Sequence, residues 1–77
     1  IAEHPLKLAT VTEIGEKAFE GCTAMTKVIF NANANVKNYA FRNCTNLKTL
    51  ENKPADENLG KDVFKDTKYQ NDLDKTV

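Results

Sequence analysis

The feature of this sequence that most constrains its fold is an internal repeat of 22 residues. Segment 18–25 (AFEGCTAM) returns as segment 40–47 (AFRNCTNL). The match extends outward at the same offset, since Leu6, Leu8 and Ile14 are followed 22 residues later by Val28, Phe30 and Val36. A fixed period in the twenties with apolar residues in register is typical of a solenoid, in which each coil stacks equivalent residues on the next.

The repeat predicts one domain, residues 1–77, with units at about 6–27, 28–49 and 50–67. Apolar and polar residues alternate at 6–8, and segment 25–33 fits the leucine-rich pattern L-x-x-L-x-L-x-x-N, which predicts one short strand per unit. We expect these strands to form a short parallel sheet on a concave face. Segments 10–15 and 31–36 read as turns back across the coil, and segments 16–20 and 37–42 as short helices or 3₁₀ turns on the convex side.

The third unit departs from the repeat. Segment 59–67 echoes segment 14–22, but its offset from the second unit is 23, with an extra residue near 53–57. Thr67 stands where the earlier units have Cys, and Gln70 stands where Leu is expected. Because terminal repeats meet water on their outer face, we expect region 59–77 to act as a C-terminal cap, largely helical over 59–75, with Tyr69 and Leu73 as apolar anchors.

The repeat also predicts the core, as the positions where apolar residues recur. These are Leu6, Leu8, Ile14, Ala18, Phe19, Cys22, Met25, Val28, Phe30, Val36, Ala40, Phe41, Cys44, Leu47, Leu50, Leu59 and Phe64.

The pattern I-G-x-x-A-F-x-x-C-x-x-M-x-x-V from Ile14 to Val28, echoed from Val36 to Leu50, resembles the BspA-like group of leucine-rich repeats. The resemblance covers about residues 6–67. It departs from the group's pattern at Lys37, which replaces Gly, and at Asn31, which replaces the Pro after the strand. The resemblance implies a right-handed α/β solenoid. It also implies a surface-anchored or secreted protein with a role in adhesion and host-protein binding.

Two cysteines one repeat apart leave two interpretations open. Cys22 and Cys44 would stack at roughly 4.8 Å, a Cα separation that allows a disulfide. Stacked side chains point the same way, however, and the repeat explains both residues as small buried fillers, so we expect reduced core cysteines. Their spacing is not C-x-x-C, which argues against a zinc or thioredoxin-like site.

Other candidate sites have plainer explanations. His4 lacks partners at metal-ligand spacing, so we expect an exposed histidine. Asn43-Cys44-Thr45 is an N-glycosylation sequon, but a core cysteine in its middle disfavours modification. The Asn/Lys-rich loop 31–38 could bind a ligand, although a solvated turn is the expected reading.

Composition limits the function further. Eleven basic and eleven acidic side chains cancel, which argues against a nucleic-acid partner. No apolar run reaches a membrane-spanning length, and no signal peptide is visible, although a chain beginning at Ile1 reads as a piece of a longer protein. No catalytic set, metal cluster or phosphate loop is present, so we expect neither an enzyme nor a cofactor.

We therefore expect a protein-binding module that uses the outward strand positions of the concave face. These are Lys7, Lys27, Ile29, Asn31, Thr49, Glu51 and Lys53. Ile29 is the informative member, as an apolar residue predicted to be exposed and ringed by charge. The alternative is a structural spacer or capping segment of a longer repeat protein, with no ligand of its own.

Overall fold

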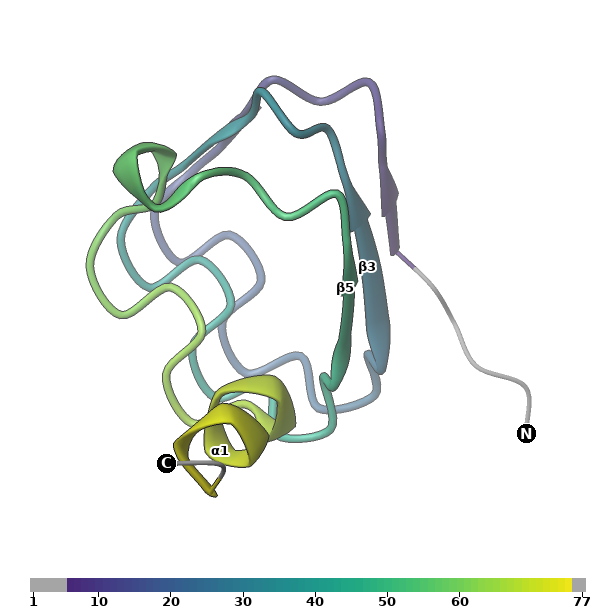
Figure 1. Cartoon of the computed structure of the whole chain (residues 1–77), viewed down its shortest axis with the longest axis vertical. Helices are drawn as coiled ribbons and strands as arrows, with labels where there is room; N and C mark the ends of the chain where they lie inside the picture. The colour runs from purple at the N-terminus through teal and green to yellow at the C-terminus, as the bar shows by residue number, and fades with distance from the viewer. Residues whose placement is uncertain (1–5, 76–77) are drawn as a thin grey trace.

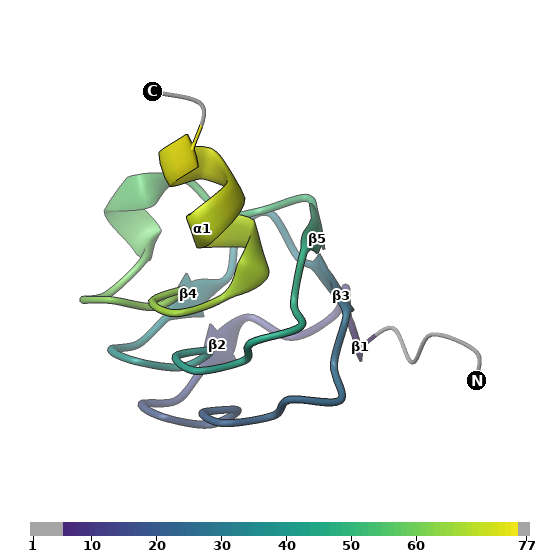
Figure 2. The same ribbon diagram turned by 90° about the horizontal axis from the view of Figure 1, so that it is seen from below.

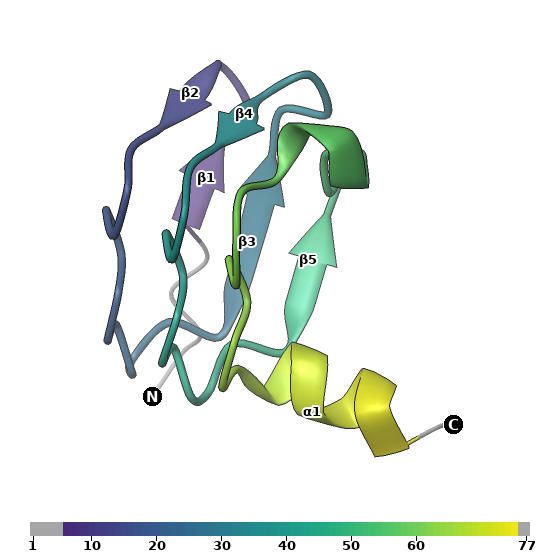
Figure 3. The same ribbon diagram turned by 90° about the vertical axis from the view of Figure 1, so that its left-hand side faces the viewer.

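Three coils of chain lie side by side in the computed structural model, which describes residues 6–75 (Figures 1 and 3). We name them first, second and third coil after the units 6–27, 28–49 and 50–67. Each contributes one strand, β1 (Leu6–Leu8), β3 (Lys27–Phe30) or β5 (Thr49–Glu51), to a parallel sheet of order β1-β3-β5. Leu6 pairs with Val28 and Val28 with Leu50, so the register of the strands equals the repeat offset.

A second parallel ladder takes the last part of both predicted turns, 10–15 and 31–36. β2 (Glu13–Ile14) pairs with β4 (Asn35–Val36), and Val36 forms a bridge with Leu59 of the third coil. Sequence reasoning missed these two-residue strands because the asparagines of segment 31–36 favour turns. Ile14 and Val36 point into the core from this side.

The segments expected to be short helices, 16–20 and 37–42, are instead successive turns. Lys17 and Tyr39 adopt positive φ angles of 58° and 61°, which no helix interior allows. Backbone N–H groups here donate to the next coil: Lys17 to Asn38, Phe19 to Ala40, Gly21 to Arg42, Tyr39 to Lys61, Phe41 to Val63 and Asn43 to Lys65. A helix would use those carbonyls internally, so stacking overrides local helix formation. The 3₁₀ helix η1 (Asp56–Asn58) lies in the loop that holds the extra residue.

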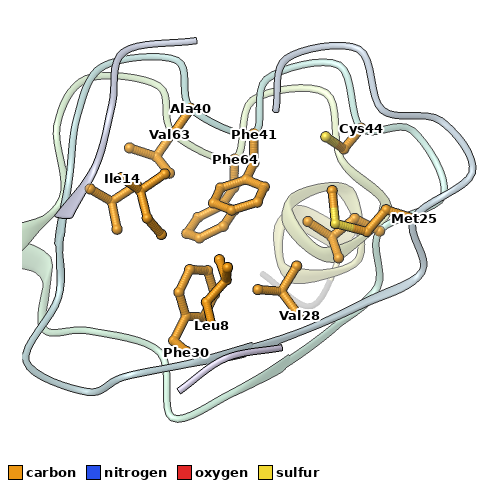
Figure 4. Close-up of a cluster of buried hydrophobic side chains, with 12 residues drawn as sticks. Leu8, Ile14, Met25, Val28, Phe30, Ala40, Phe41, Cys44, Val63 and Phe64 are labelled. Carbon is orange, nitrogen blue, oxygen red and sulfur yellow. The ribbon is translucent and has the colours of Figure 1, made fainter. Parts of the chain in front are cut away.

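Stacked phenylalanines form the centre of the core (Figure 4). Phe41 stacks on Phe19 with ring centroids 5.2 Å apart and on Phe64 at 5.7 Å. Phe30, from β3, meets Phe41 edge-on at 5.5 Å. Each aromatic pair adds about 0.5–1.5 kcal/mol beyond the burial of its surface.

Two predicted core residues are not in the core. Ala18 and Cys22 are exposed, while their second-coil counterparts Ala40 and Cys44 are fully buried. The reason is their place at the end of the stack, since no coil among residues 6–75 covers that side of the first coil. Four further predicted members pack against the core while only partly buried: Leu6, Phe19, Leu50 and Leu59.

Four buried residues were absent from the predicted core: Ala34, Pro54, Val63 and Thr67. Val63 occupies the repeat position of Ala18 and Ala40, so the repeat itself could have identified it.

The predicted cap is helical only over α1 (Lys68–Lys75), at the end of the stack farthest from β1 (Figure 2). Segment 59–67 continues the coil, because its carbonyls accept the N–H groups of the second coil. The Thr67 hydroxyl accepts a hydrogen bond from the Gln70 N–H at 3.1 Å and so caps the helix. Tyr69 packs on Phe64 at 5.6 Å. Leu73 is 45% exposed, so its predicted role as an anchor is wrong.

Candidate functional site

We call the seven predicted ligand-binding residues the sheet face, because five of them lie on the strands of the main sheet. It comprises Lys7, Lys27, Ile29, Asn31, Thr49, Glu51 and Lys53. Lys7 pairs in register with Ile29 and Ile29 with Glu51, which forms one row across all three strands. Lys27 pairs with Thr49 in the neighbouring row. Asn31 follows immediately after the end of β3, and Lys53 is the second residue after the end of β5.

Three charged residues of the sheet face already form ion pairs, two of them with each other. Lys27 Nζ lies 2.7 Å from Glu51 Oε2 on the adjacent strand. Lys53 Nζ lies 3.1 Å from Asp56 Oδ1 and donates to the Pro54 carbonyl. Such partly exposed pairs contribute about 0–1 kcal/mol each, so they can exchange partners with a ligand at small cost.

Ile29 is half-buried rather than fully exposed. β3 is the central strand of the sheet, so side chains of both neighbouring strands, β1 and β5, lie beside Ile29 and cover part of it. In β3 the inward residues Val28 and Phe30 are buried and the outward residues Lys27 and Ile29 are half-buried, as strand alternation predicts. The row therefore has an apolar centre, partly shielded, between a lysine and a glutamate.

Both cysteine thiols are free, in very different surroundings. The Cys44 Sγ–H donates to the Phe19 carbonyl across the coil boundary at 3.0 Å. Burial raises the pKa of the Cys44 thiol, because the interior disfavours a thiolate. Cys22 is exposed on the first coil. Reduced thiols were expected, but a core position for Cys22 was not found.

The other candidate segments are mainly turns. In loop 31–38 the Asn31 side chain accepts a hydrogen bond from the Asn33 N–H at 2.9 Å, and Ala34 is buried beneath the loop. Asn43 of the sequon is exposed with φ 65°. His4 lies outside the described residues, as does Pro5, which the repeat offset aligns with Lys27.

One polar cluster, on the turn segments 16–20 and 37–42, was missed by sequence reasoning. Arg42 forms an ion pair with Glu20, with Nε 2.6 Å from Oε2, and its guanidinium lies 4.2 Å from the centre of the Tyr39 ring. Glu20 and Arg42 are 22 residues apart, so stacking by the repeat offset would have paired them.

Residues 6–75 contain neither a candidate metal site nor a candidate membrane-spanning helix. No group of three or more His, Cys, Asp or Glu side chains could hold a metal ion there. In the same residues no helix has the length and apolar character needed to cross a membrane.

Comparison with known families agrees with the geometry. The family model of the BspA type leucine rich repeat region, which describes six copies, matches residues 6–73. No curated protein and no solved structure matches the chain. The match covers most of the chain, including all three strands of the main sheet and most of α1. The chain therefore belongs to the BspA-type leucine-rich repeat family.

Proposed function

We propose that this chain is a non-enzymatic protein-binding module that captures a protein ligand on the sheet face. The observation that carries the proposal is the in-register row Lys7–Ile29–Glu51, which places an apolar residue between opposite charges across three strands. Protein interfaces commonly have an apolar centre and a polar rim, and Ile29 with its charged neighbours has that layout.

A surface or secreted location and a role in adhesion belong to the same proposal. Support comes from membership of the BspA type family, which is associated with bacterial surface proteins. A balanced charge of 11 basic and 11 acidic side chains favours a protein over a nucleic-acid partner. A right-handed sense of the coils is also part of the proposal, since parallel crossover connections are right-handed in nearly all proteins.

The competing function is that of a structural spacer, and one observation favours it. Lys27 and Glu51 satisfy each other, and Ile29 is already half-buried by its neighbours. A spacer needs no side chain on this face to be available for a ligand. A β-branched residue in a central strand can reflect strand propensity alone.

The experiment compares Ile29→Ser with Glu13→Ser, an exposed position on β2 of the other sheet. Each variant is passed over a panel of immobilised extracellular-matrix and plasma proteins, and its unfolding is measured in denaturant. We expect Ile29→Ser to lose capture at least tenfold while remaining folded, and Glu13→Ser to behave like the parent. Equal capture by both variants, or a loss that follows unfolding, would leave the spacer function.

A further inference from the structure

The third coil ends the described stack with a row of unused backbone donors. In the first and second coils, alternate N–H groups of the turn segments donate to carbonyls of the following coil, over N···O distances of 2.8–3.1 Å. The donors are Lys17, Phe19 and Gly21 in the first coil and Tyr39, Phe41 and Asn43 in the second. One repeat further on, the corresponding groups are those of Asp62, Phe64 and Asp66. None of these three donates a hydrogen bond within residues 6–75. Because the equivalent N–H groups of the earlier coils point toward the following coil, these three point to the outer side of the third coil, away from the second.

A hollow of about 470 Å³ lies along this row of donors. Its lining includes Phe64 and Leu59 from the coil and Gln70, Asn71 and Asp74 from α1. The hollow is therefore a groove between the outer edge of the third coil and one side of the helix. It is separate from the sheet face, none of whose seven residues lines it.

The charge of the groove is acidic. Asp62, Asp66 and Asp74 line it, with Lys65 as the one basic residue of its lining. Asp62 and Asp66 both have positive φ, 52° and 61°, where asparagine or glycine would serve the backbone equally well. The backbone geometry alone therefore does not require carboxylates at these two positions.

Neighbouring elements limit what can occupy the groove. Both η1 and α1 project beyond the third coil, away from the second, one at each end of the segment that carries the donors (Figure 3). A complete further coil from a second copy would have to pass through α1. A single extended segment, by contrast, can lie along the edge and present alternate carbonyls to donors two residues apart.

We infer that this groove binds an extended, lysine- or arginine-containing segment of a partner protein. Three alternate carbonyls of the segment accept hydrogen bonds from the N–H groups of Asp62, Phe64 and Asp66. Its basic side chains face the carboxylates at the rim. This is recognition by addition of a strand, with backbone bonds supplying attachment and charge supplying preference.

The test uses a fluorescein-labelled seven-residue peptide in which lysine and valine alternate, and a counterpart with glutamate in place of lysine. Binding is measured by anisotropy to the whole chain and to the double variant Asp62→Asn/Asp66→Asn, because asparagine tolerates the positive φ. The control, Glu13→Gln/Glu16→Gln, removes the same charge from exposed positions on the first coil. Amide resonances report where the peptide lies.

We expect the lysine peptide to bind, to weaken about tenfold in the Asp62/Asp66 variant, and to be unaffected in the control. The amide protons of residues 62, 64 and 66 should shift downfield together. Equal binding of both peptides, shifts confined to the sheet face, or no binding at all would overturn the inference. Dimerisation of the chain that blocks the peptide would overturn it in favour of a second copy as occupant.

Discussion

The first and second coils carry the same small residues at two matching positions of the repeat and bury them very differently. Ala18 and Cys22 are exposed, whereas Ala40 and Cys44, 22 residues later, are fully buried. The second coil has a neighbour on each side, and the first has one among the described residues (Figure 3). In a solenoid, burial therefore depends on neighbouring coils as much as on residue type, because each coil buries its faces only against the next.

The largest difference between the coils should appear at the stacked phenylalanines. Phe41 is fully buried between Phe19 and Phe64, so Phe41→Ala should destabilise the fold by about 3–5 kcal/mol. Phe19 is partly exposed, and Phe19→Ala should cost roughly half as much. Denaturant unfolding of both variants measures the difference. Equal losses would mean that the first coil is as well covered as the second.

Glycine positions in the first and third coils provide a second matched pair. A Cβ on Gly60 would collide with Asn38 Oδ1 and lie 2.7 Å from the Asn38 backbone nitrogen, whereas one on Gly15 would meet nothing within 4 Å. Gly60→Ala should therefore destabilise by about 1–3 kcal/mol, and Gly15→Ala by less than about 0.5 kcal/mol. Thermal unfolding of the two variants tests this, and a neutral Gly60→Ala would contradict the close approach of the second and third coils.

The smallest expected effect concerns the ion pair that joins the first two coils. A double-mutant cycle on Glu20 and Arg42, each changed to Ala, should give a coupling of about 0.5–1 kcal/mol, because both side chains are partly buried. The same cycle on Lys68 and Asp72 of α1, about half exposed, should give about 0.3 kcal/mol or less. A coupling near zero for both pairs would show that Glu20–Arg42 contributes nothing to coil stacking.

Much of the fold was predictable because the repeat offset is also the strand register. Leu6, Val28 and Leu50 align in the sequence and in the sheet, and the two rows Lys7–Ile29–Glu51 and Lys27–Thr49 follow from the same offset. Local pattern was less reliable. The helices expected at 16–20 and 37–42 are turns, because hydrogen bonds between coils compete with those inside a helix. The sequence of a single repeat indicates only the local hydrogen bonds of a helix and not the bonds to the next coil.

The ends of the stack were the hardest to predict. Exposure of Cys22 depends on the absence of a covering coil among residues 6–75, which no property of the residue reveals. At the other end, Thr67 replaces a core cysteine and caps α1, a role visible only once the helix start is known. The groove beside α1 was missed for a similar reason, since unused backbone donors leave no mark in the sequence.

The two cysteines offer the most direct test of the stacked-coil account. Native protein is treated with a thiol-reactive maleimide, and labelling at each site is followed by mass spectrometry of peptides. The account predicts rapid labelling of exposed Cys22, and labelling of Cys44 only as fast as the chain unfolds, because Cys44 is buried and its raised pKa keeps the thiol protonated. Equal rates at both sites in the folded protein would contradict the burial of the second coil between its neighbours.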